Sequence, residues 1–324
     1  MQRQAPPEPD ELLSSLQPAL EVLHAEKDYL RPHDKQGKPG GIVRLSPVRT
    51  TVVIPDVHAR MDLVRRIMDI PVQLSEDATA PRLATALQQG RAQLVFVGDY
   101  VHAEQREADR WRAAMQEFLE GFKKHRFMDE EMRESLGTIQ MLACIKAAFP
   151  EAVHLLKGNH ENILNQEGEG NHAFGKFAYE GQMVATYMQQ FYPAEVIQGV
   201  DDFERSLPLL AVGAGFLVSH AEPKRAFTPQ EIRDFRSNPD VIEGLTWTDN
   251  GEAEEGSVAK MLSTYTAGDS DDETYYFAGH RPVSGRFGTR ADGRFIQLHN
   301  PSAGIAAVIS PDRRFDPEED ILYI

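Results

Sequence analysis

Side chains that can bind metal ions follow five short apolar runs along the chain. They are Asp56 and His58 after "TTVVIP" (50–55), Asp99 after "QLVFVG" (93–98), Asn159 and His160 after "AVHLLKG" (152–158), His220 at the end of "LLAVGAGFLVSH" (209–220) and His280 at the end of "TYYFAGH" (274–280). Carboxylate, amide and imidazole donors without a thiolate suit Mn²⁺, Fe or Zn²⁺. With His160 set aside, six donors remain, which is too many for one tetrahedral ion. They are about right for two ions that share a carboxylate, which can clamp a phosphoryl group and generate a hydroxide between them.

The apolar runs predict how these side chains are positioned. Each run is short and rich in β-branched residues, as are "RFIQLHN" (294–300) and "IAAVIS" (305–310), and this is typical of strands. Their nearly continuous apolar character indicates burial on both faces. Helical patterns lie between several of them, so the sequence predicts an α/β fold with sheets between helices. Ligands bind at the carboxyl ends of strands in such folds, and neighbouring strands would bring the donors into one crevice.

Outside these runs, the chain divides into an N-terminal arm and a catalytic domain. Residues 1–48 contain a helical pattern and then a loop rich in Gly and charged residues, which predicts a helical arm. The expected catalytic domain spans residues 49–324. Two stretches of it, about 102–148 and 162–206, have the character of helical insertions. The acidic segment 250–273 is expected to be a surface loop around a short helix.

The composition is that of a globular protein with a large core. The chain has 324 residues, of which 41% are hydrophobic, and a formal charge of −16. The negative charge argues against nucleic acid or an anionic membrane as a partner of the whole surface. A single cysteine, Cys144, excludes an intramolecular disulfide. The N-terminus lacks the apolar core of a signal peptide, and no run approaches the ~18 apolar residues of a membrane helix, so we expect a cytoplasmic protein.

Five motifs, in this order, resemble those of the calcineurin-like metallophosphoesterases. They are "DVH" (56–58), "GDYV" (98–101), "GNHE" (158–161), "SHAE" (219–222) and "GHRPV" (279–283). The second and third motifs are most similar to the phosphoprotein phosphatase branch, the serine/threonine protein phosphatases and their bacterial relatives. The resemblance covers about residues 50–300. It implies a central β-sandwich of mixed sheets flanked by helices.

The resemblance also implies a dinuclear metal site. One ion would be held by Asp56, His58 and Asp99, and the other by Asp99, Asn159, His220 and His280. Asp99 would therefore be shared by both ions and take part in catalysis. His160 would be the general acid that protonates the leaving oxygen. Mn²⁺ is the expected metal, with Fe and Zn²⁺ as alternatives.

The implied activity is hydrolysis of phosphomonoesters by a hydroxide that bridges the two metals. The substrate would be a phosphorylated protein, carrying phosphoserine or phosphothreonine, or a phosphorylated small molecule. Two alternatives stay open. One is a hydrolase of the same superfamily that acts on dinucleoside polyphosphates or phosphodiesters. The other is a binding module that keeps its metals without turnover. The sequence does not indicate an oligomeric state.

The second motif departs from the pattern of the branch, which usually reads Gly-Asp-x-Val-Asp-Arg-Gly. The aspartate that orients the acid histidine in the family is replaced by His102, and the arginine that binds phosphate is replaced by Ala103. Imidazole cannot supply the negative charge of a carboxylate. We therefore expect His102 to line the pocket, and Glu104 or Glu161 to take over the carboxylate role.

The phosphate-binding arginine must then come from elsewhere in the chain. Arg60 and Arg281 lie close in sequence to predicted ligands and are the best candidates, followed by Arg106 and Arg110. The planar guanidinium suits this role because it can bind phosphate through two parallel hydrogen bonds. Two further histidines, His172 and His299, could approach the site, although we do not expect either to be a ligand.

Overall fold

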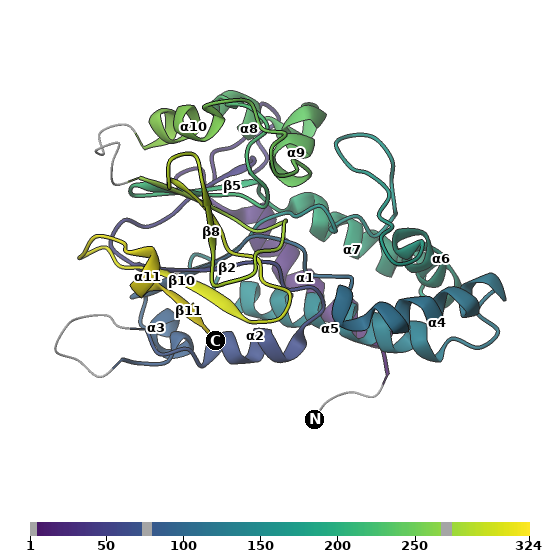
Figure 1. Cartoon of the computed structure of the whole chain (residues 1–324). Helices are drawn as coiled ribbons and strands as arrows, with labels where there is room; N and C mark the ends of the chain where they lie inside the picture. Colours follow the sequence, from purple (N-terminus) through teal and green to yellow (C-terminus); the bar gives the residue numbers. More distant parts are fainter. Residues whose placement is uncertain (1–4, 73–79, 267–273) are drawn as a thin grey trace.

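The computed structural model describes residues 5–72, 80–266 and 274–324, and its strands form two sheets. The five-stranded sheet has the order β11 (Ile321–Tyr323), β10 (Ile305–Ile309), β2 (Thr50–Ile54), β3 (Ala92–Phe96), β4 (Val153–Leu155). The six-stranded sheet has the order β1 (Ile42–Arg44), β5 (Leu210–Gly213), β6 (Phe216–Val218), β7 (Tyr275–Ala278), β9 (Phe295–Gln297), β8 (Gly288–Arg290). Helices cover the outer faces of both sheets (Figure 1). This arrangement confirms the predicted α/β class with mixed sheets flanked by helices.

Both sheets have a parallel centre. In the first sheet β2, β3 and β4 run parallel, with Val53 opposite Val95 and Phe96 opposite Leu155. In the second sheet β6, β7 and β9 run parallel, with Phe277 opposite Ile296. Parallel strands end at the same edge of a sheet, so the segments that follow all six strands start from two neighbouring edges.

Alternate residues of each strand enter different parts of the core, because successive side chains of a strand point to opposite faces. On β2, Val53 packs between the sheets, while Val52 and Ile54 pack against the outer helices. On β7, Phe277 packs between the sheets and Tyr276 packs outward. The apolar character of these strands therefore reflects burial on both faces, as expected.

The helices form two groups. The five-stranded sheet is covered by α1 (Pro9–Ala25), α2 (Met61–Met68), α3 (Leu83–Gln88), α4 (Ala108–Leu119), α5 (Arg126–Ala148), α6 (Glu180–Phe191) and α7 (Ala194–Ser206), which share one core cluster. The six-stranded sheet is covered by α8 (Pro229–Arg233), α9 (Pro239–Thr246) and α10 (Ser257–Tyr265). A short α11 (Pro317–Asp320) precedes β11. The two stretches predicted to be insertions contain α4 with α5, and α6 with α7 (Figure 1), and their status as insertions stays a prediction. Of the acidic segment, residues 267–273 lie outside the described part of the chain.

Helix α1 packs into the core. Its buried Leu12, Leu16, Ala19 and Leu23 belong to the cluster that α5 and α7 also line. The helix begins at Pro9, with Glu8 as its N-cap, and continues through Pro18. Further along the expected arm, β1 pairs with β5 at the edge of the six-stranded sheet. The division of the chain at residue 48 stays a prediction.

A buried charge cluster fastens the segment after α1 to α5. The Glu26 carboxylate accepts hydrogen bonds from Lys146 Nζ at 2.7 Å and from Arg31 at 2.9 Å. All three side chains are almost completely buried. Burial alone would raise the pKa of Glu26, but the two cations outweigh it and lower this pKa below its ordinary value.

Candidate metal centre

The predicted donors converge where the carboxyl-terminal edges of the two sheets meet. The side chains form three groups whose ligand atoms lie within 4.8 Å of one another. The groups are Asp56, His58 and His299; His58, Asp99 and His160; and Asp99, His220 and His280. Six strands supply these residues, from β2, β3, β4, β6, β7 and β9. The geometry therefore brings together five of the six predicted donors and His160, and it adds His299.

Asp99 lies at the centre of the cluster. One of its carboxylate oxygens, Oδ2, is 3.3 Å from His220 Nε2, 3.7 Å from His58 Nε2 and 3.8 Å from His160 Nε2. Burial would raise the pKa of this carboxyl, but the nearby imidazoles hold it well below its usual value. For His220, burial would lower the pKa, but Asp99 outweighs it and raises this pKa to about 9. Asp99 is thus ionised, and imidazole rings surround its carboxylate on several sides.

Asn159, the sixth predicted metal ligand, faces the imidazoles of His220 and His280. Its Oδ1 is 2.9 Å from His220 Nε2 and 3.0 Å from His280 Nδ1. On the other side of the cluster, His58 Nδ1 lies 3.0 Å from the carbonyl oxygen of His102. An N–H at Nδ1 that donates to this carbonyl leaves the Nε2 lone pair directed at Asp56 and Asp99, which is the tautomer that a ligand needs.

The backbone at the site is held in a conformation that L-residues rarely adopt. The φ angles are 44° at His58, 59° at Ala59, 53° at Asp99, 60° at His102 and 63° at His280. Such left-handed conformations in residues other than glycine are uncommon and concentrate at functional sites. Ala59 is thus an alanine held in a conformation that favours glycine.

The glycines of the motifs make room for the carboxylates. A Cβ atom on Gly158 would lie 2.3 Å from Asp99 Oδ1, and one on Gly279 would lie 1.8 Å from Asp56 Oδ2. Of the three motif glycines Gly98, Gly158 and Gly279, only Gly98 has a positive φ, of 118°. The other two are required because the carboxylates approach the backbone closely.

Glu161 supports the loops from below. Its carboxylate accepts hydrogen bonds from the backbone N–H groups of Asp99, Tyr100 and Gly158, at 2.9, 2.8 and 2.7 Å. Burial, followed by repulsion from Asp99, raises the pKa of Glu161 to about 7. This carboxylate therefore fixes the ends of β3 and β4, and it is directed at the backbone rather than at the imidazole of His160.

His102 contacts the Nδ1 side of the His160 ring, whose Nε2 faces Asp99. Their Nδ1 atoms are 2.9 Å apart, and both side chains are buried. The ring of Phe174 stacks on His102 at 5.5 Å and 9°, and its centroid is 3.8 Å from that of His160. Burial, reinforced by His58, lowers the pKa of His102 to about 3. His102 is thus a neutral partner of His160 and is covered by an aromatic ring.

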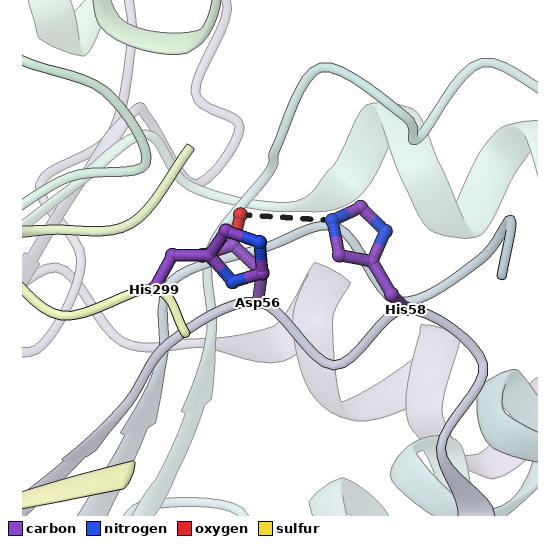
Figure 2. A group of neighbouring side chains, drawn as sticks. All are labelled: Asp56, His58 and His299. Carbon is purple, nitrogen blue, oxygen red and sulfur yellow. Dashed lines mark ion pairs between the residues drawn. The ribbon is translucent and has the colours of Figure 1, made fainter. Parts of the chain in front are cut away.

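His299, which the sequence placed near the site but not among the ligands, is a member of the cluster (Figure 2). It follows β9, its side chain is fully buried, and its Nδ1 lies 3.6 Å from Asp56 Oδ2. Its Nε2 is 2.9 Å from the Glu104 carboxylate. A signal was present in the sequence, because His299 ends an apolar run just as the expected ligands do.

A cleft of about 290 Å³ opens onto the cluster. Its floor includes His58, Asp99 and Asn159, and one wall comes from residues 173–176 of the second insertion. Lys176 and Arg281 place positive charge on the walls. Lys176 Nζ lies 3.7 Å from Glu104 Oε1, and Arg281 pairs with Asp249. Sequence reasoning missed Lys176, because nothing near it in the chain indicates that its loop folds over the site.

The chain resembles known proteins in both sequence and structure. The family model described as calcineurin-like phosphoesterase matches residues 49–307. The chain belongs to this family. A protein serine/threonine phosphatase from Saccharomyces cerevisiae shares the fold, with a TM-score of 0.59 and 14% identity over 98% of this chain and 89% of that chain. A cold-active protein-tyrosine phosphatase of a psychrophilic Shewanella species aligns at a TM-score of 0.47 and 14% identity, over 91% and 80% of the chains. No curated protein sequence matches the phosphoesterase significantly.

The other three candidates for the phosphate-binding arginine, Arg60, Arg106 and Arg110, do not line the cleft. Arg60 donates to the backbone carbonyl oxygens of Val57 and Asp56, at 2.9 and 2.8 Å. Arg106 and Arg110 both donate to the Glu134 carboxylate. Neither Arg60 nor His102 is among the residues that line the cleft. Of the predicted substrate-binding residues, only Arg281 lines the cleft.

The donor set of the phosphoesterase fits divalent metal ions. Among the described residues of this cluster, three buried imidazole nitrogens have no hydrogen-bond partner: Nδ1 of His220, Nε2 of His280 and Nδ1 of His299. Buried polar atoms are rarely left without a partner. Mixed carboxylate, amide and imidazole donors suit Mn²⁺, Fe or Zn²⁺. Across the described residues, no helix combines the length and apolar character that a membrane span requires.

Proposed function

We propose that the chain is a dinuclear-metal phosphatase that hydrolyses phosphomonoesters. The observation that carries this proposal is the central position of Asp99, whose carboxylate oxygen lies within 4 Å of three imidazoles from three different segments. Membership of the calcineurin-like phosphoesterase family supports a phosphoester hydrolase.

The ligands are assigned to two ions that share Asp99. Asp56, His58 and Asp99 would hold the first ion, and Asp99, Asn159, His220 and His280 would hold the second. When bound, two divalent cations supply Lewis-acid chemistry, which polarises the phosphoryl oxygens and makes water a better nucleophile at neutral pH. Mn²⁺ is the metal we expect.

His160 is the general acid of the proposed reaction. It lines the cleft, with Nε2 on the side of Asp99 and Nδ1 held by His102. With His160 protonated, the Nδ1–H donates to the lone pair of His102 Nδ1, and the Nε2–H is the proton that passes to the leaving oxygen. His102 therefore fixes the ring of the acid, while Phe174 keeps water from the pair.

Lys176 and Arg281 bind the phosphate of the substrate in this proposal. They stand on opposite segments of the cleft wall, one from the second insertion and one directly after His280. Charge-assisted hydrogen bonds to phosphate are stronger than neutral ones. Each cation is now paired with one carboxylate, Glu104 or Asp249, and would exchange part of that contact for phosphate oxygens.

A substrate panel tests the proposed function. Metal-free protein, prepared with EDTA, is assayed with and without Mn²⁺ on p-nitrophenyl phosphate, bis-p-nitrophenyl phosphate, diadenosine tetraphosphate and a phosphoserine peptide. We expect EDTA to abolish hydrolysis of the monoesters and Mn²⁺ to restore it. Full activity of the metal-free protein would contradict the proposal. Preference for the diester or the dinucleotide would instead favour the alternative hydrolase.

The variant His160→Asn separates an enzyme from a binding module. If His160 donates the proton, this variant should keep its metals and lose about 10²–10⁴-fold in kcat, the usual contribution of a general acid. Equal and negligible rates in the wild type and the variant, with metal bound in both, would favour a module without turnover.

A further inference from the structure

The segment after β9 reaches the same edge of the six-stranded sheet as the segments that carry His220 and His280. Strand β9 runs parallel to β7, with Ile296 opposite Phe277. The residue two positions beyond β9 is His299, whose side chain is fully buried. Parallel pairing therefore delivers a third imidazole from this sheet, beside Asp56 and His58 (Figure 2).

The two ring nitrogens of His299 have different surroundings. Nε2 lies 2.9 Å from Glu104 Oε2, which is hydrogen-bond distance. Nδ1 lies 3.6 Å from Asp56 Oδ2 and has no hydrogen-bond partner among the described residues. The ring centroids of His299 and His58 are 5.3 Å apart, so both imidazoles border the same space.

The hydrogen bond at Nε2 decides what Nδ1 can do. An Nε2–H that donates to Glu104 leaves a lone pair on Nδ1, and this lone pair faces a carboxylate oxygen of Asp56. Two electron-pair donors in a buried space are stable when a cation lies between them. Histidines that bind metals almost always donate their other N–H to a carboxylate, a carbonyl or water, which fixes the tautomer and makes the ligand more basic.

We propose that His299 is a further ligand of the ion held by Asp56, His58 and Asp99, and that Glu104 orients it. This inference rests on the proposed function in one respect, the binding of two ions. It makes the two sites equivalent in donor type. The first site then has two carboxylates and two imidazoles, and the second has one carboxylate, one amide oxygen and two imidazoles.

Metal binding by full-length variants tests this role without an activity assay. His299→Gln keeps an amide that can donate to Glu104 and removes the donor at the Nδ1 position. His299→Asp supplies a new oxygen donor on a short side chain. Each metal-free protein is titrated with Mn²⁺ to measure affinity. Elemental analysis after dialysis counts the ions bound per chain, and Co²⁺ absorption spectra report the ligand field. His125→Ala, a half-exposed histidine that precedes α5 and pairs with Asp129, is the control.

We expect two Mn²⁺ per chain in the wild type and in His125→Ala. His299→Gln should bind one ion with unchanged affinity and the other at least 10-fold more weakly, with a changed Co²⁺ spectrum, and His299→Asp should recover most of the loss. Glu104→Gln keeps an oxygen acceptor for Nε2–H, so it should lose less than His299→Gln. Two ions bound by His299→Gln with wild-type affinity and spectrum would overturn the inference alone. A wild type that binds no metal would overturn the proposed function as well. Thermal unfolding in EDTA shows that each variant is folded.

Discussion

The Nδ1 atoms of His102 and His160 lie 2.9 Å apart, in the place where an aspartate faces the acid histidine in the family that the motifs resemble. An aspartate would favour the charged form of its neighbour, whereas a neutral imidazole only orients it. Burial holds the pKa of His160 well below its usual value, and His58 and His102 lower it further against the opposing effect of Asp99. His102 therefore orients the ring of His160 but does not supply the negative charge that an aspartate would.

Restoring the carboxylate should change the pH dependence of the reaction. In His102→Asp, the negative charge raises the pKa of His160, so the acid stays protonated to higher pH. The alkaline limb of the kcat profile should therefore move to higher pH. His102→Asn offers a neutral acceptor and should lower kcat about tenfold without this movement, as a fraction of the ~10²–10⁴-fold that a general acid contributes. Superimposable pH profiles for the two variants would contradict a charge effect at this position.

The two cations of the cleft should determine affinity for phosphate. Lys176→Met and Arg281→Met keep apolar stems and remove the charges. Each should lower kcat/KM for p-nitrophenyl phosphate by about 10–100-fold, because hydrogen bonds between charged groups are worth about 1.5–3 kcal/mol. Each should also weaken inhibition by inorganic phosphate. Lys260→Met, on the exposed side of α10, is the matched control and should behave as the wild type. Unchanged inhibition by phosphate in both cleft variants would show that Lys176 and Arg281 do not bind the substrate phosphate.

The buried central strands were predictable because their pattern is local and strong. Strands β2, β3, β4, β7, β9 and β10 all fall within apolar runs of the sequence. The run at 209–220 is two antiparallel strands, because a turn at Ala214 and Gly215 reverses the chain. Strands β1, β8 and β11 lie at sheet edges and are partly exposed, so no continuous apolar run marks them in the sequence.

The candidate site was predictable only where strand order decides it. Donors that follow parallel strands converge whatever the loops do, which is why Asp56, Asp99 and His220 are close together. Lys176 reaches the cleft for another reason. Its loop is pinned by the Asn162 side chain, which bonds the carbonyl oxygens of Gln166 and His172, and by the Glu180 carboxylate, which accepts from the Lys176 backbone. Contacts of this kind depend on the folded loop and leave no periodic trace in the sequence.

The charge cluster around Glu26 should control stability. In Glu26→Gln, Lys146 and Arg31 remain buried without a counter-charge, and breaking a buried ion pair in this way costs about 3–5 kcal/mol. Urea unfolding at pH 7 measures the loss. Glu21→Gln, an exposed change on α1, should stay within about 0.5 kcal/mol of the wild type. Equal stability of the two variants would show that the cluster contributes nothing.

The same cluster predicts a pH dependence. The pKa of Glu26 is lower in the folded protein than its ordinary value of 4.5. A depressed carboxyl pKa contributes stability that is present above the unfolded value and is lost as the pH falls through the folded value. The difference in unfolding free energy between the wild type and Glu26→Gln should therefore narrow as the pH falls below about 4.5. A difference that stays constant down to pH 3 would mean that Glu26 acts through shape rather than charge.

The close approach of Gly279 to Asp56 should make this glycine essential for metal binding. The backbone N–H of His280 holds the Asp56 carboxylate at 2.9 Å, and a Cβ atom on Gly279 would lie 1.8 Å from the same group. Gly279→Ala must therefore displace a ligand, and we expect Mn²⁺ affinity to fall by about 10–100-fold, as when a supporting contact of a ligand is lost. Gly285→Ala, six residues on, adds a methyl group where no atom lies within 4 Å, and it should bind as the wild type. Both proteins should give the same far-ultraviolet circular dichroism spectrum. Wild-type affinity in Gly279→Ala would mean that the Asp56 carboxylate is free to move without loss, and that its position does not determine metal binding.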